Sequence, residues 1–107
     1  APDATMKSLA SITPKAFGRF HYARLSDSNI AILLTGLSLE QATMLMESFR
    51  VLVEDQLVLL DNISFNFSIS AGVAQDNQSN ITDLLRQADN RLYLAKENGG
   101  NVVWNQD

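Results

Sequence analysis

Residues 20–34 read FHYARLSDSNIAILL, and the rest of the chain is organised around them. Two short strand-like segments flank a polar turn, which consists of Ser26, Asp27, Ser28 and Asn29. The second segment, residues 30–34, is apolar throughout, which is typical of a strand buried on both faces. The stretch therefore predicts a β-hairpin whose turn lies at one edge of the core, where a small domain can carry its working residues.

The composition is that of one ordinary globular domain. The chain has 107 residues, of which 46% are hydrophobic and 19% charged,. Twelve acidic and eight basic side chains give a net charge of −4, which disfavours broad nucleic-acid or membrane-surface binding. The lack of cysteine excludes disulfides, thiolate zinc sites and thiol nucleophiles,. A single histidine excludes a His-rich metal site.

No apolar run reaches the length of a membrane span, and the start of the chain carries no signal-peptide pattern. We therefore expect a cytoplasmic location, with the chain either on its own or as the cytoplasmic part of a longer sensor protein. The sequence begins Ala1-Pro2 without methionine, which suggests that it is cut from something longer.

Two helices are predicted in the first half of the chain. Residues 2–12 have amphipathic spacing, and Pro14 is expected to stop that helix, because proline disfavours helical geometry in the residue before it. A second helix begins at Ser38, whose hydroxyl and the side chain of Gln41 fit a capping box. The buried stripe of this helix recurs at three- and four-residue spacing and consists of Leu39, Ala42, Leu45, Met46, Phe49, Leu52 and Val53,.

Residues 63–73 give the clearest strand pattern, because apolar and polar side chains alternate along the segment. Asn80 is expected to cap a third helix, and Gly99 and Gly100 to end it in the left-handed conformation that glycine accepts. Residues 102–104 form a last short strand. The order α-β-β-α-β-α-β predicts a two-layer α/β sandwich, with helices packed over a mostly antiparallel mixed sheet.

Three segments of the chain match the pattern of a known family. Residues 67–74, FSISAGVA, are similar to its strand "vSiGva", and residues 88–101, ADNRLYLAKENGGN, to its closing signature "ADxALYxAKxxGRN". Residues 31–42 fit its "AILLPGxxLEEA" pattern. On this resemblance, which covers about residues 4–103, the chain is identified as a member of the GGDEF domain family, the diguanylate cyclases, with a nucleotide-cyclase-like fold.

The resemblance implies an activity that the turn residues contradict. Active members condense two GTP molecules into cyclic di-GMP with two metal ions, and their name motif occupies the hairpin turn. The five motif positions are Ser26, Asp27, Ser28, Asn29 and Ile30 here. The first four replace two glycines, a metal-binding acid and a glutamate, and only Ile30 keeps the apolar character of its position. Neutral hydroxyls and amides supply no charge to compensate divalent ions. We interpret the turn as a vestigial active site without catalytic or metal-binding residues, and Asp27 as a turn-forming residue.

Other positions depart from the family pattern as well. The family's first strand, which carries a second metal-binding aspartate, has no counterpart before Ala1. Residues 1–107 are therefore expected to form a single degenerate domain, equivalent to the C-terminal two-thirds of the family fold. Gly100 stands in place of a phosphate-contacting arginine. Lys96 is kept, either as a phosphate contact or as a solvated lysine at a helix C-terminus, where the dipole favours cations.

Three functional readings remain open. The first is a non-catalytic GGDEF-like domain of bacterial cyclic di-GMP signalling, which binds no cofactor and regulates or contacts a protein partner or flanking signalling domain. The second is a receptor whose pocket binds GTP or cyclic di-GMP without turnover, through Lys96 and backbone amides of the hairpin turn. The third is a fragment of a longer diguanylate cyclase-like protein. None involves nucleic acid or membrane contact by this domain.

The missing first strand leads to one more expectation. In the family's sheet this strand lies between the equivalents of residues 30–34 and 63–73. Without it, both segments present unpaired edges, and such edges invite pairing with another chain. We expect either that these two strands pair directly or that a second copy completes the sheet in a homodimer.

Overall fold

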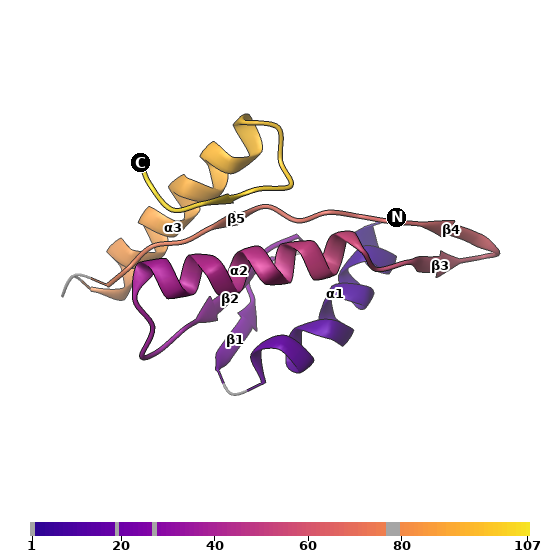
Figure 1. The fold of residues 1–107 in the computed structure, drawn as a ribbon, viewed down its shortest axis with the longest axis horizontal. Helices are drawn as coiled ribbons and strands as arrows, with labels where there is room; N and C mark the ends of the chain where they lie inside the picture. Colours follow the sequence, from indigo (N-terminus) through magenta and orange to yellow (C-terminus); the bar gives the residue numbers. More distant parts are fainter. Residues whose placement is uncertain (1, 19, 27, 77–79) are drawn as a thin grey trace. The chain divides into compact units, whose positions relative to one another are not determined.

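The computed structural model describes residues 2–18, 20–26, 28–76 and 80–107. Its elements, which Figure 1 shows along the chain, are α1 (Pro2–Phe17), β1 (His21–Arg24), β2 (Ile30–Leu33), α2 (Leu39–Glu54), β3 (Val58–Leu60), β4 (Ile63–Phe65), β5 (Ala71–Gly72), α3 (Ile81–Glu97) and β6 (Val103–Trp104). They confirm the α/β class. The chain divides into a first unit, Ala1–Gly36 with Asp55–Phe67, and a second unit, Leu37–Glu54 with Ser68–Asp107.

The first unit contains α1 and two hairpins. In one hairpin β1 pairs antiparallel with β2, and Tyr22 lies opposite Ile32. In the other, β3 pairs antiparallel with β4, and α1 packs against β3. Among the residues of this unit whose burial the structure describes, Thr13, Phe17, Phe20 and Val58 are buried. Burial of these mainly apolar side chains is the main force that stabilises such a small unit.

The second unit is built on a βαβ arrangement. The strands β5 and β6 are parallel, with Ala71 opposite Val103 and Gly72 opposite Trp104, and α3 connects and covers them. Parallel strands need such a crossover, because a tight turn cannot join them. The helix α2 packs against β6, and contributes Ala42, Met46, Phe49 and Val53 to the buried residues.

Gly72 sets how closely β5 approaches α3. A Cβ atom at this position would overlap the backbone of Ala88 and Leu92. Only glycine therefore allows the strand and the helix backbone to lie at this separation.

The local signals for the ends of α2 and α3 are confirmed. Ser38 N donates to Gln41 Oε1 at 3.0 Å and Gln41 N donates to Ser38 Oγ at 3.1 Å, as the capping box requires,. Asp83 N donates to Asn80 Oδ1 at 2.8 Å. Gly99 N and Gly100 N donate to the carbonyls of Lys96 and Ala95 at 3.2 and 3.1 Å, so α3 ends in a Schellman motif,.

The prediction that Pro14 stops the first helix is wrong, since α1 continues to Phe17. Proline inside a helix costs about 3 kcal/mol, because it lacks the amide donor and its ring crowds the preceding turn. Continuing the helix places Phe17 at 0% exposure and Thr13 at 2%, and the Thr13 hydroxyl donates to the Leu9 carbonyl at 2.6 Å. Burial of these side chains offsets the cost of the proline.

The prediction of one long strand over residues 63–73 is also wrong. The strands β4 and β5 occupy only its two ends, and residues 66–70 lie in no strand. The strand β3, which was not predicted, pairs with β4 through a turn at Asp61 and Asn62. The strand β4 is therefore one arm of a short hairpin and not the start of a long strand. Both turn residues have positive φ, +48° and +68°, the signature of the type I′ hairpin turn.

A single mixed sheet is not found among the described residues. They form three two-stranded ladders, β1–β2, β3–β4 and β5–β6, of which the first two are antiparallel and the third parallel. The expected direct pairing of residues 30–34 with residues 63–73 is therefore wrong. None of the helices in the described ranges is long and apolar enough to cross a membrane.

Candidate functional site

The predicted working turn connects β1 to β2 in the first unit. Leu25 N donates to the Asn29 carbonyl at 2.8 Å, and Ser26 N approaches the same oxygen at 3.4 Å. Ser28 N donates to Ser26 Oγ at 3.3 Å, a side-chain contact that stabilises a tight turn. Arg24 Nε donates to the Ser26 carbonyl at 3.0 Å. The turn thus holds its own shape through local hydrogen bonds.

These hydrogen bonds limit what the turn can bind. The amide N–H groups of Leu25, Ser26 and Ser28 already donate hydrogen bonds within the turn, so they are not free to bind a phosphate. Ser26 and Ser28 are exposed and Asn29 is half-buried. Their side chains offer neutral oxygens, whereas Mg²⁺ between phosphates favours carboxylates. The predicted site residue Asp27 lies outside the described residues.

Lys96, the predicted phosphate contact, lies in the second unit. It is exposed in the last turn of α3, where its backbone carbonyl accepts the Gly99 amide of the helix end. A lysine at this position complements the negative end of the helix dipole. The structure therefore groups Ser26, Ser28 and Asn29 in one turn and places Lys96 in the other unit.

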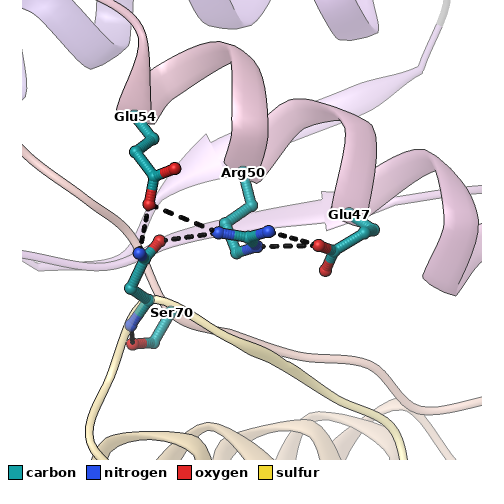
Figure 2. Close-up of polar contacts among 5 residues, drawn as sticks. Glu47, Arg50, Glu54 and Ser70 are labelled. Carbon is teal, nitrogen blue, oxygen red and sulfur yellow. Dashed lines mark hydrogen bonds and ion pairs between the residues drawn. The ribbon is translucent and has the colours of Figure 1, made fainter.

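One polar cluster of the second unit was not predicted. Arg50 Nε donates to Glu47 Oε1 at 3.0 Å, and Arg50 Nη1 lies 3.6 Å from Glu54 Oε2. Arg50 Nη1 also donates to Asn101 Oδ1 at 2.9 Å, and Asn101 Nδ2 donates to Glu54. Asn101 N donates to Ser70 Oγ at 3.1 Å. Figure 2 shows the three α2 side chains pointing toward the segments that carry these partners; we call these five residues the Arg50 cluster.

The electrostatics of the Arg50 cluster follow from these contacts. The hydrogen bond from Arg50 holds the pKa of Glu47 below its ordinary value of 4.5. The same hydrogen bond, with the nearby carboxylates, raises the pKa of Arg50. The spacing of Glu47, Arg50 and Glu54 by three and four residues is a sequence signal for helix ion pairs. No such signal links them to Asn101, which lies 51 residues after Arg50.

A second unpredicted group is the buried Arg91 on α3. Its Nη1 donates to the Val73 carbonyl at 2.8 Å, and its Nε donates to Asp107 Oδ1 at 3.2 Å. The side chain is only 10% exposed. A buried cation needs such partners, because removing a charge from water without hydrogen-bonding or ionic partners strongly destabilises the folded state. The contact ties the last residue of the chain to α3 and to the segment after β5.

No three His, Asp or Glu side chains within the described part of the chain lie close enough together to hold a metal ion.

Comparison with known proteins gives one family. The model described as "Diguanylate cyclase, GGDEF domain" matches residues 3–102. The probable diguanylate cyclase DgcT of Escherichia coli (strain K12) is 38% identical over an alignment of 87 residues, and the match covers 76% of this chain and 19% of that protein. The chain therefore spans about a fifth of the length of this relative.

Solved structures agree with this similarity. The GGDEF domain of FimX from Pseudomonas aeruginosa superposes with a TM-score of 0.87 at 28% identity, over 98% of this chain and 66% of that one. The GGDEF domain of DgcB from Caulobacter crescentus, solved in complex with cyclic di-GMP, gives a TM-score of 0.88 at 20% identity, over 96% of this chain and 63% of that one. At that identity the second similarity concerns the fold alone.

Proposed function

The chain belongs to the GGDEF domain family of diguanylate cyclases, and on this premise we propose that it is a degenerate, non-catalytic member. Its role is that of a regulatory or interaction domain in cyclic di-GMP signalling. It contacts a protein partner or a flanking signalling domain, in the cytoplasm, and holds no metal or cofactor. The observation that carries the proposal is the turn from Ser26 to Asn29, where motif alignment expects two glycines, a metal-binding acid and a glutamate.

The chemistry of the turn supports the loss of catalysis. Condensation of two GTP molecules needs divalent ions at the phosphates, and those ions need carboxylate ligands. Ser28 and Asn29 are neutral at the two acidic positions of the motif. The Ser26 hydroxyl accepts the Ser28 amide at 3.3 Å, so the turn is closed by its own side chain.

An activity assay tests this proposal directly. We expect no cyclic di-GMP when the protein is incubated with GTP and Mg²⁺ or Mn²⁺, while an active diguanylate cyclase in a parallel reaction forms the product. The Ser28→Asp/Asn29→Glu variant is assayed beside it as a matched comparison for the two neutral motif positions, because it restores two carboxylates without changing the rest of the turn. Product formed by the unmodified chain at the rate of the active enzyme would refute the proposal.

The alternative is a receptor that binds GTP or cyclic di-GMP without turnover. It is motivated by the relative DgcB, which has this fold and was solved with cyclic di-GMP. The internal hydrogen bonds of the Leu25, Ser26 and Ser28 amides favour the interaction domain over this reading. Titration calorimetry with GTP and with cyclic di-GMP separates the two: a pure interaction domain gives no binding heat, whereas a receptor gives a saturable one that Lys96→Ala weakens.

A third reading is that the chain is a fragment of a longer diguanylate cyclase-like protein, in line with the partial coverage of its relatives. The same activity assay on a longer protein containing this sequence tests it. Ser28 and Asn29 stand in the turn in that protein as well, so we expect it to remain inactive at this site.

A further inference from the structure

The end of α3 carries a dipeptide with a chemistry of its own, Asn98-Gly99. The side chain of an asparagine can be attacked by the backbone nitrogen of the next residue, which is one reason why asparagine is thermolabile. Glycine hinders this attack least, because it has no Cβ and its backbone is the most permissive. Every other asparagine of the chain precedes a residue with a side chain. The sequence therefore distinguishes Asn98 from the rest.

The folded helix end holds the two reacting groups in other hydrogen bonds. Asn98 and Gly99 are both exposed, so water reaches them. The side-chain Nδ2 of Asn98 donates to the Leu94 carbonyl at 2.8 Å, and Gly99 N donates to the Lys96 carbonyl at 3.2 Å. The nitrogen that would attack and the carboxamide that it would attack are thus both restrained.

The backbone conformation of Asn98 also keeps these groups apart. A five-membered ring can close only when Gly99 N and Asn98 Cβ lie on the same side of the Asn98 Cα–C bond. Asn98 has φ −97° and ψ +27°, so Gly99 N lies on the side of the Asn98 backbone nitrogen, away from Cβ. Rotation about this bond would break the hydrogen bonds that Gly99 N and Gly100 N donate to the last turn of α3. Ring closure therefore requires that turn to open.

We propose that Asn98 is a site of spontaneous deamidation, and that opening of the last turn of α3 controls its rate. In the open state Gly99 N gives its proton to solvent hydroxide and forms a bond to Asn98 Cγ. The Cγ–Nδ2 bond breaks, and the side-chain nitrogen takes up a proton and leaves as ammonia. Water then opens the resulting succinimide at one of its two carbonyls, which gives aspartate or isoaspartate. One water molecule is consumed for each ammonia released, and no other reactant is needed.

The products fit the helix end less well than Asn98 does. Both replace the Nδ2 donor by a carboxylate, so the Leu94 carbonyl loses that hydrogen bond,. The new negative charge lies at the negative end of the helix dipole, where anions are unfavourable. Isoaspartate also adds a carbon to the main chain and shifts the amides of Gly99 and Gly100 out of register. Deamidation is therefore expected to leave the end of α3 open more often.

The first test compares the folded and the unfolded chain. Peptide mapping by mass spectrometry follows the exchange of NH₂ for OH at each asparagine in mildly alkaline buffer, with and without urea. In urea we expect Asn98 to react before every other asparagine and to give both aspartate and isoaspartate. Without urea we expect its rate to be about tenfold lower or less, because the reaction follows the small population of the open state.

The second test weakens the helix end without changing the reacting dipeptide. Gly100 has φ +71°, so Gly100→Ala makes the closed state less favourable. We expect it to accelerate deamidation of the folded chain about fivefold or more, the factor that corresponds to a left-handed residue with a Cβ. Its rate in urea should not change. The matched control is Gly36→Ala, which has the same kind of strain at φ +82° but lies in the first unit, so it should leave the rate at Asn98 unchanged.

Circular dichroism confirms that both variants are folded before the rates are compared. Four results would overturn the proposal: another asparagine reacting first in urea, equal rates at Asn98 with and without urea, aspartate formed without isoaspartate, or equal acceleration by Gly36→Ala and Gly100→Ala. The last result would mean that the reaction needs unfolding of the whole chain. None of these measurements involves nucleotide, so their outcome is independent of the proposed function.

Discussion

Arg91 Nη1 donates a 2.8 Å hydrogen bond to the carbonyl oxygen of Val73. The donor lies on α3 and the acceptor just after β5, and the arginine side chain is 10% exposed. The second unit therefore contains a buried cation whose partner is a backbone carbonyl. The outer contact with Asp107 is far more accessible, because that carboxylate is 62% exposed.

We expect Arg91→Met to lower the free energy of unfolding by about 1–3 kcal/mol, because it leaves the Val73 carbonyl buried without a donor. Asp107→Asn should cost less than about 1 kcal/mol, since exposed ion pairs contribute little. Urea unfolding of both variants checks the order. Arg86→Met, at an arginine that is 75% exposed, is the control for loss of a surface guanidinium. Equal effects of Arg91→Met and Arg86→Met would contradict the role of the buried contact.

Gly72→Ala should destabilise the second unit by about 3 kcal/mol or more, because the added Cβ overlaps the backbone of α3,. Gly36→Ala provides the comparison. Gly36 has φ +82° but open space around its Cα, so its substitution costs only about 1 kcal/mol of backbone strain. Thermal unfolding followed by circular dichroism distinguishes the two, and a mild effect at position 72 would show that β5 and α3 can separate freely.

Asn101 contributes through both its backbone and its side chain. Its φ is +51°, and its side chain contacts Arg50 and Glu54. Asn101→Gly removes the side-chain contacts but keeps the left-handed conformation accessible, whereas Asn101→Ala loses both. We expect the alanine variant to be less stable than the glycine variant by about 1 kcal/mol in urea unfolding. If the two variants are equally stable, the backbone conformation imposes no cost.

The Arg50 cluster should make stability depend on pH on the acid side. Arg50 lowers the pKa of Glu47 in the folded state, so the contribution is complete above the ordinary value of 4.5 and is lost as the pH falls through the lower folded-state value. Because the Glu47 side chain is 47% exposed, the contribution is below about 1 kcal/mol. Unfolding measured from neutral to strongly acidic pH checks this. Glu47→Gln should flatten that part of the profile.

Local backbone chemistry explains which parts of the fold could be predicted. The helix start at Ser38 and the helix end at Gly99 depend on hydrogen bonds between residues a few positions apart, and both are confirmed. The turn at Asp61 and Asn62 is also local, since Asp and Asn accept the positive φ that it has,, but the sequence analysis did not predict it. Pairing partners are chosen by tertiary packing, so strand length could not be read from the alternating pattern of residues 63–73.

The candidate site could likewise be predicted only in part from the sequence. Motif alignment placed Ser26, Ser28 and Asn29 in the hairpin turn, where the structure has them. The alignment could not show that the Ser28 amide donates a hydrogen bond to the Ser26 hydroxyl. The buried Arg91 was missed for another reason: its acceptor is a main-chain carbonyl, which no residue type reveals in advance.

The close approach of β5 to α3 has a genetic consequence. The atoms that exclude a side chain at position 72 belong to the main chain of Ala88 and Leu92. Trimming those side chains leaves the main-chain atoms in place, so no substitution on the helix can act as a second-site suppressor of Gly72→Ala. A revertant screen should recover the glycine itself. Position 72 is thus constrained by main-chain packing, remote in sequence from the turn between β1 and β2.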